Sequence, residues 1–115
     1  MEQTVRDRQV RAARNQSKWR DINELALTNK RENSNFRSFA CECADESCSE
    51  ELSLTREEYE AVRRRPDHFV VKIGHVVPDV ERVVTNGADG TRYQIVEKLG
   101  AAGRVAAERD PRAPA

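Results

Sequence analysis

The sequence predicts an α+β fold, and three observations lead to this prediction. Residues 4–29 contain neither proline nor glycine and repeat apolar residues every seven positions, which is typical of a long helix. Thr55 and Glu58 have the spacing of a capping box, which predicts a second, short helix. Three later runs are rich in β-branched and aromatic residues, which predicts a small antiparallel sheet of three strands.

The N-terminal helix has a narrow apolar stripe, made of Val5, Ala12, Trp19 and Ala26 with Ile22 and Leu25 beside Trp19. We expect this helix to pack on its own domain. A coiled-coil contact between two subunits, and hence a homodimer, is the alternative. It is disfavoured by the polar residues at the intervening positions, Arg8, Asn15 and Asn29. The polar segment 28–35 should end the helix and act as a linker.

The region after residue 50 supplies the remaining elements. Leu52 and Leu54 alternate with polar residues, which favours a short strand or extended segment. The short helix over residues 55–65 should bury Tyr59 and Val62 and should stop ahead of Pro66, because proline restricts the residue before it.

The predicted sheet is built from residues 68–75, 80–85 and 91–98. In the first of these strands Phe69, Val71 and Ile73 should share one face. The segment NGADG, residues 86–90, has the Asn-Gly and Asp-Gly pairs that suit a hairpin loop between the other two strands.

Composition suggests one small domain with a thin core. Of 115 residues, 37% are apolar and 35% are charged, so a cross-link or a metal would help stability. We expect residues 1–35 to form the helix and linker, 36–99 the α+β domain, and 100–115 a flexible tail or a weak helix. The start of the chain lacks the pattern of a secretory signal and no run is long enough to span a membrane, so we expect a cytoplasmic protein.

The three cysteines, Cys41, Cys43 and Cys48, all fall within the stretch CECADESC. Structural disulfides are rare in a reducing compartment, three thiols cannot all pair, and free cysteines are usually buried singly. A metal is therefore the favoured explanation. Zinc prefers four nitrogen and sulfur ligands in a tetrahedron, and the chain offers two histidines. We favour His75 as the fourth ligand, because Gly74 allows a sharp turn that aims its ring, and we expect His68 in solvent.

We therefore expect one zinc ion per chain, with iron left open as the cellular metal, in a structural Cys3His site. Three thiolates leave such a site with a formal charge of −1. Nearby carboxylates add to that charge, at Glu42, Asp45, Glu46, Glu50 and Glu51. Arg63, Arg64 and Arg65 would offset it if the short helix folds over the cysteine loop; otherwise they form a solvated face.

The words FACECADESC, EYEAVR, FVVKIGHVVPDVERVV and VEK resemble a family of small, mostly actinobacterial proteins of unknown function. The resemblance covers roughly residues 10–98, and its distinguishing patterns are the C-E-C-x4-C and the G-H. It implies that Cys41, Cys43, Cys48 and His75 form one site. It implies no reaction, substrate or partner.

These observations favour a small zinc-binding interaction or regulatory module that binds another protein, with transcription as one setting. The acidic metal loop would be repelled by phosphates, and only 5% of residues are aromatic. Nucleic acid stays as an alternative partner, bound through basic residues of the first helix or at the end of the second: Arg6, Arg11, Arg14, Lys18, Arg20, and Arg63 to Arg65.

Two other functions remain open at this point. Oxidation of the clustered thiols could expel the metal, which would make the site a redox switch. An enzyme would need an open zinc position, with Glu42 or Glu46 as general base, but catalytic zinc keeps only three protein ligands. We therefore expect a protein that is not an enzyme.

Overall fold

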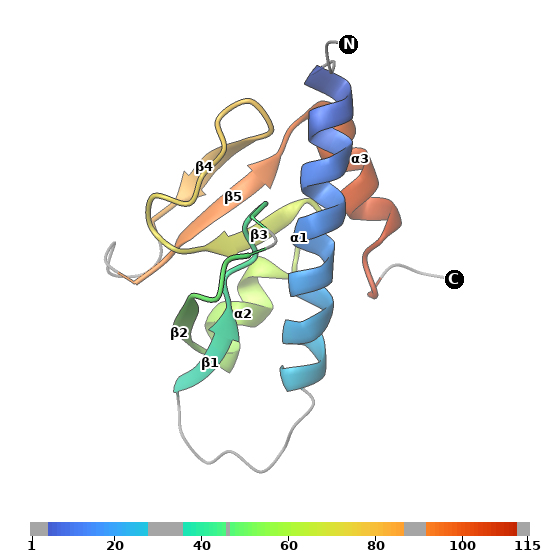
Figure 1. The fold of residues 1–115 in the computed structure, drawn as a ribbon. Helices are drawn as coiled ribbons and strands as arrows, with labels where there is room; N and C mark the ends of the chain where they lie inside the picture. Colours follow the sequence, from blue (N-terminus) through green and yellow to red (C-terminus); the bar gives the residue numbers. More distant parts are fainter. Residues whose placement is uncertain (1–4, 28–35, 46, 87–91, 113–115) are drawn as a thin grey trace.

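The computed structural model describes residues 5–27, 36–45, 47–86 and 92–112. It confirms the α+β class. The elements follow the order α1 (Val5–Leu27), β1 (Phe36–Ala40), β2 (Glu51–Thr55), α2 (Arg56–Val62), β3 (His68–Val71), β4 (Glu81–Thr85), β5 (Gln94–Lys98) and α3 (Gly100–Glu108) (Figure 1). The predicted linker 28–35 and nearly all of the predicted hairpin loop lie outside the described residues.

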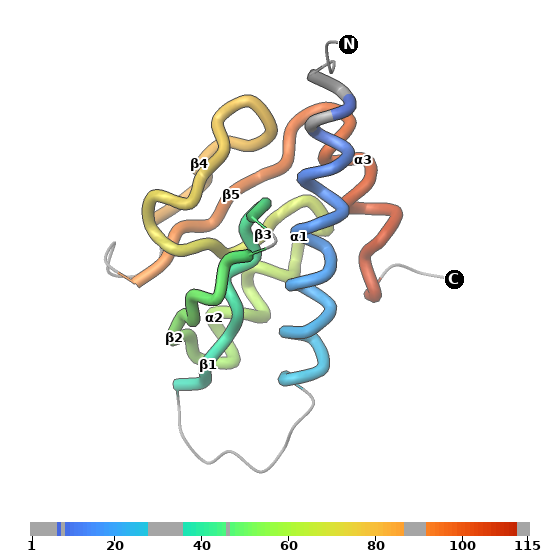
Figure 2. The backbone as a smooth tube through the Cα atoms, in the orientation of Figure 1, coloured from blue at the N-terminus to red at the C-terminus, as the bar shows by residue number. Residues whose placement is uncertain are grey.

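Two antiparallel sheets form the β part of the fold. β1 pairs with β2, and the second sheet has the order β3-β5-β4, which confirms the predicted three strands. In Figures 1 and 2, α1 runs the length of the molecule, with both sheets on one side of it and α3 on the other. β1 was not predicted as a strand. None of the described helices is both long enough and apolar enough to cross a membrane.

The apolar core lies where α2, β1, β2 and β3 meet. Tyr59 and Val62 are fully buried, as predicted, and the Tyr59 ring stacks on Phe39 with a centroid distance of 4.5 Å. The predicted strand 68–75 is shorter, because it ends at Val71. All three apolar residues of β3 are buried, while Ile73 lies beyond the strand and is 42% exposed. The expected one-sided alternation is therefore wrong, since both faces of β3 are covered.

The capping box at α2 forms as predicted. The Glu58 amide donates to Thr55 Oγ1 at 3.0 Å, and the Thr55 amide donates to Glu58 Oε1 at 2.8 Å. Arg92 and Tyr93, which directly precede β5, also bind the Glu58 carboxylate. Arg92 lowers the pKa of Glu58 to about 2. This one carboxylate therefore ties the helix start to the three-stranded sheet.

Helix α1 packs on its own chain, but only part of the predicted stripe is covered: Ala12 is buried and Trp19 half-buried, whereas Ala26 is exposed. Its buried face is mostly polar and contains Ala12, Ala13, Gln16, Ser17, Arg20, Asn23 and Leu27. Ile22 and Leu25 are 49% and 72% exposed. Polar residues are buried here because they reach backbone carbonyls: Arg20 donates to Pro66 O and Ala106 O, both at 2.8 Å.

Residues 100–108 form helix α3 rather than a flexible tail, so the structure shows the helical alternative for this segment. Ala102 and Ala106 are fully buried, and α3 lies along α1 (Figure 1). Gly103 lies in close packing against β5, because a Cβ there would lie 3.0 Å from Lys98 O.

Candidate metal centre

Three sulfurs and one imidazole from separate segments meet in the structure. The ligand atoms of Cys41, Cys43, Cys48 and His75 all lie within 4.8 Å of one another. His75 Nδ1 is 3.6 Å from Cys41 Sγ and 3.7 Å from Cys48 Sγ. Zinc–sulfur bonds of about 2.3 Å and zinc–nitrogen bonds of about 2.0–2.1 Å at a tetrahedral angle place such atoms roughly 3.6 Å apart. These four residues therefore lie close enough to bind a metal.

Backbone hydrogen bonds fix the cysteine loop between β1 and β2. The Cys41 amide donates to Glu50 O at 3.0 Å, which extends the pairing of the two strands. The Cys48 amide closes a turn onto Asp45 O at 3.2 Å. Three of the four candidate ligands therefore come from one short loop held at both ends.

The fourth candidate ligand, His75, comes from the turn after β3. Its amide donates to Lys72 O at 2.9 Å, and Gly74 within this turn has φ +91°. Non-glycine residues rarely adopt such a φ, so the predicted role of Gly74 is confirmed. His75 is half-buried at this position.

Glu42, between two of the candidate ligands, anchors the loop to the core. Its side chain is fully buried and accepts hydrogen bonds from Asn23 Nδ2 at 2.8 Å, Tyr59 Oη at 2.7 Å and the Val70 amide at 3.0 Å. Its own amide donates to Val70 O. Burial raises the pKa of this carboxyl.

Glu42, which was counted among the carboxylates that add charge near the site, is therefore a buried side chain held by three donors of the core. Neighbouring side chains of an extended segment point to opposite sides. In a C-x-C segment, the side chain between the two cysteines can therefore point away from them. This alternation in the sequence could have predicted that Glu42 points into the core.

The other acidic residues of the loop face solvent or make local bonds. Asp45 accepts from the Ser47 amide and hydroxyl at 2.9 and 2.7 Å. Glu50 pairs with Lys72 at 3.1 Å, and Glu51 is exposed. Glu46 lies outside the described residues.

The three thiols differ in pKa because they form hydrogen bonds with one another and are buried to different extents. A hydrogen bond with Cys41, aided by one from His75, lowers the pKa of Cys43 to about 5. The same contact with Cys43, together with burial, raises the pKa of Cys41, and burial raises the pKa of Cys48. The Lys72 amide donates to Cys41 Sγ at 3.1 Å. Such backbone donors stabilise a thiolate, the form that binds metals.

Charge compensation by Arg63, Arg64 and Arg65 was expected only if the short helix folds over the cysteine loop, and among the described residues none of the three forms an ion pair with a carboxylate of that loop. Arg63 is buried and bridges Glu24 and Asp110, while its charge opposes the rise in the pKa of Glu42 that burial causes. Arg64 and Arg65 are exposed, as in the solvated alternative. The physical reason is that α2 packs against β2 and β3, and its end meets α1 and the residues after α3 instead of the loop.

Lys98 is a buried cation paired with a carboxylate inside the fold. Burial lowers the pKa of Lys98, whereas Glu81 and, to a smaller extent, Cys43 raise it. Lys98 and Glu81 form an ion pair with both side chains fully buried. The charge of Lys98 is therefore compensated mainly by Glu81.

His68 is separate from the three sulfurs, as expected, but it is not in solvent. Its side chain is 14% exposed, and Nε2 lies 3.4 Å from Glu97 Oε2 and 3.9 Å from Asp67 Oδ1. These three residues are near enough to share a cation. However, Arg82 already pairs with Glu97 at 2.9 Å and Arg65 with Asp67 at 3.5 Å, so the carboxylates are neutralised by protein.

Comparison of the chain with protein-family models, curated protein sequences and solved structures gives no match. The resemblance noted from the sequence therefore stays a prediction.

Proposed function

We propose that this protein is a small interaction or regulatory module whose fold is stabilised by one zinc ion, and that its partner is another protein. The observation that carries the proposal is the meeting of Cys41, Cys43, Cys48 and His75. Soft thiolate ligands with one imidazole suit zinc better than magnesium or calcium, which prefer oxygen. The bound ion would supply a cross-link between the loop after β1 and the turn after β3.

A structural role for the ion is supported by the ligand count and by the core. Four protein ligands fill a tetrahedron and leave no position for a reacting water. The Glu42 carboxylate is engaged by three donors, which supports a role in folding over one as a base. Since α1 buries several polar residues, the apolar core is small, and metal binding would contribute directly to folding.

Elemental analysis of the purified protein tests the proposal. We expect one zinc per chain, with the zinc lost in Cys43→Ala and His75→Ala. His68→Ala is the matched control, because His68 is also half-buried but lies apart from the sulfurs, and it should keep its zinc. Chelation should unfold the wild-type protein. Unchanged zinc content in both ligand variants would reject the site, and a stable fold after chelation would reject the structural role.

A redox switch is the second candidate function, and the partial exposure of Cys48 favours it. A peroxide could oxidise two of the clustered thiolates to a disulfide while it is itself reduced to water, and the metal would lose two ligands. Mild peroxide should then release zinc together with a change in partner binding. Retention of zinc under mild peroxide would exclude the switch.

A further inference from the structure

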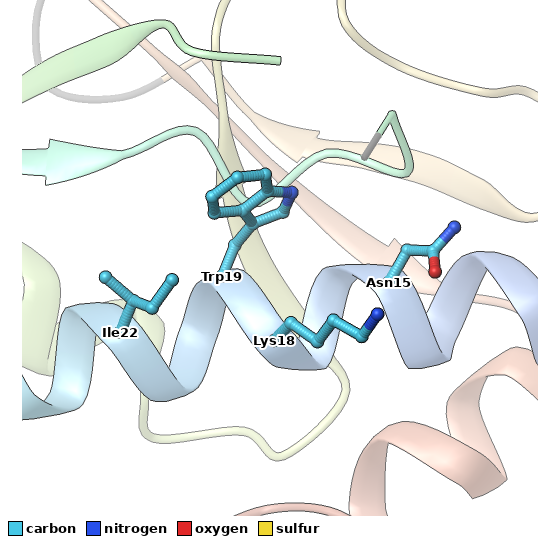
Figure 3. Close-up of a pocket in the computed structure, with 4 residues that line it drawn as sticks. All are labelled: Asn15, Lys18, Trp19 and Ile22. Carbon is cyan, nitrogen blue, oxygen red and sulfur yellow. The ribbon is translucent and has the colours of Figure 1, made fainter. Parts of the chain in front are cut away.

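Three neighbouring hollows lie between α1 and the candidate metal centre. A hollow of about 270 Å³ is lined by Asn15, Lys18, Trp19 and Ile22 (Figure 3). A second hollow of about 260 Å³ shares Asn15 with the first, and it shares Ala44 and Val77 with a third of about 250 Å³ that reaches the candidate metal centre. We call these three hollows the metal-loop groove.

The α1 wall of this groove offers apolar surface beside the ammonium group of Lys18. Figure 3 shows Trp19 and Ile22 on neighbouring turns of α1, with Lys18 and Asn15 beside them. Ile22 is 49% exposed and Lys18 is exposed. Asn15 donates to Ala44 O at 3.3 Å and so joins this wall to the cysteine loop. An occupant can therefore place an apolar group against Ile22 and the Trp19 ring and an acceptor beside Lys18.

The same wall carries positive charge that the fold does not neutralise. Arg11 and Lys18 line the groove and Arg14 lies between them along α1. All three are exposed, and none of them forms an ion pair within the described ranges. Arg20, the other described cation proposed above for nucleic acid on α1, is buried between Pro66 and Ala106. The unpaired cations therefore gather on the exposed side of α1, where they favour an anionic occupant.

The opposite wall argues against a nucleic acid. Asp45 lines the third hollow and Asp79 the second, and both are exposed. A phosphate backbone that follows the groove would meet these carboxylates. A peptide can instead place one carboxylate at the basic end and uncharged residues elsewhere.

We infer that the metal-loop groove binds an extended acidic segment of a partner protein, with an apolar side chain against Trp19 and Ile22 and a carboxylate beside Lys18. The inference rests on the proposed function, because the metal-bound loop that carries Ala44 forms the opposite wall. The inference specifies which surface binds the partner and what chemistry the partner has. The metal centre alone specifies neither.

Selection of a random peptide library displayed on phage, with the zinc-loaded protein as target, tests this inference. The enriched peptides should combine Asp or Glu with an aromatic or branched apolar residue. Their binding should shift the fluorescence of Trp19, the single tryptophan of the chain. Lys18→Glu and Ile22→Asp should each weaken binding by roughly tenfold or more, as expected for a lost charge-assisted bond or apolar contact.

Matched controls lie on other surfaces. Arg104→Glu reverses an exposed charge on α3, and Val84→Asp introduces a carboxylate at an exposed apolar position of β4. Both variants should bind the selected peptides like wild type. Equal weakening by the control variants would overturn the inference, because it would indicate a non-specific effect.

Other outcomes identify another occupant or none. Absence of enrichment, or enrichment of basic peptides, would overturn the inference. A dimer in sedimentation equilibrium that Ile22→Asp dissociates would assign the groove to a second copy of the chain. A single-stranded oligonucleotide that competes with the peptides and depends on Lys18 would assign it to nucleic acid. The zinc content of each sample separates these failures from a failure of the metal site.

Discussion

Replacing Glu42 with alanine should destabilise the protein strongly, although the residue binds no metal in our proposal. The change removes the acceptor of three buried hydrogen bonds. Asn23 keeps its bond to Ala40 O, but the Tyr59 hydroxyl and the Val70 amide lose their acceptor. An unsatisfied buried donor costs about 1–3 kcal/mol. Burial of the carboxyl is itself unfavourable, as its raised pKa shows, so we expect a net loss of about 2–4 kcal/mol.

Urea unfolding of the zinc-loaded protein, followed by Trp19 fluorescence, measures this loss. Glu50→Ala is the matched control, because Glu50 lies in the same loop but pairs with Lys72 at the surface, and it should cost less than about 1 kcal/mol. Glu42→Gln keeps the shape and one acceptor oxygen, so it should fall between the two. If Glu42→Ala and Glu50→Ala proved equally stable, the anchoring role of Glu42 would be refuted.

Three further predictions concern the buried ion pair, the stability of the fold at low pH and the protonation of the His75 ring. Lys98→Met should lower the unfolding free energy by about 3–5 kcal/mol, because it leaves Glu81 buried and unpaired, and the double variant Lys98→Met/Glu81→Gln should recover part of this loss in the same urea assay. Arg92 depresses the pKa of Glu58 from an ordinary 4.5 to about 2, so the stability that Glu58 contributes is present above pH 4.5 and is lost as the pH falls toward 2. The difference in unfolding free energy between wild type and Glu58→Gln should therefore be constant at higher pH and shrink in that window; a constant difference throughout would contradict the shift. Since Nδ1 of His75 faces the sulfurs, long-range proton–nitrogen NMR of the zinc form should show the proton on Nε2, and a proton on Nδ1 would reject this ligation.

Features encoded by neighbouring residues were predictable from the sequence. The capping box of Thr55 and Glu58, the alternating leucines of β2 and the turn at Gly74 each depend on a few adjacent positions. The meeting of Cys41, Cys43, Cys48 and His75 was also predictable, because three clustered cysteines and a histidine after a glycine carry their chemistry in residue type and spacing.

Features set by distant backbone groups were not predictable. Helical periodicity assigned Ile22 to the buried stripe, yet α1 buries Asn23 and Arg20. Their amide and guanidinium groups meet carbonyls from β1, from the segment between α2 and β3, and from α3. Distant partners also explain the burial of Arg63, because it pairs with the carboxylates of Glu24 and Asp110, which are 39 and 47 residues away in the sequence. Nothing local distinguishes such residues from solvated ones.

X-ray absorption spectroscopy of the zinc-loaded protein tests the central claim most directly, because it counts the ligands around the metal. We predict three sulfurs at about 2.3 Å and one nitrogen at about 2.0–2.1 Å from the zinc. Fewer than three sulfurs in the first coordination sphere, or an oxygen in place of the imidazole nitrogen, would contradict a site made by Cys41, Cys43, Cys48 and His75.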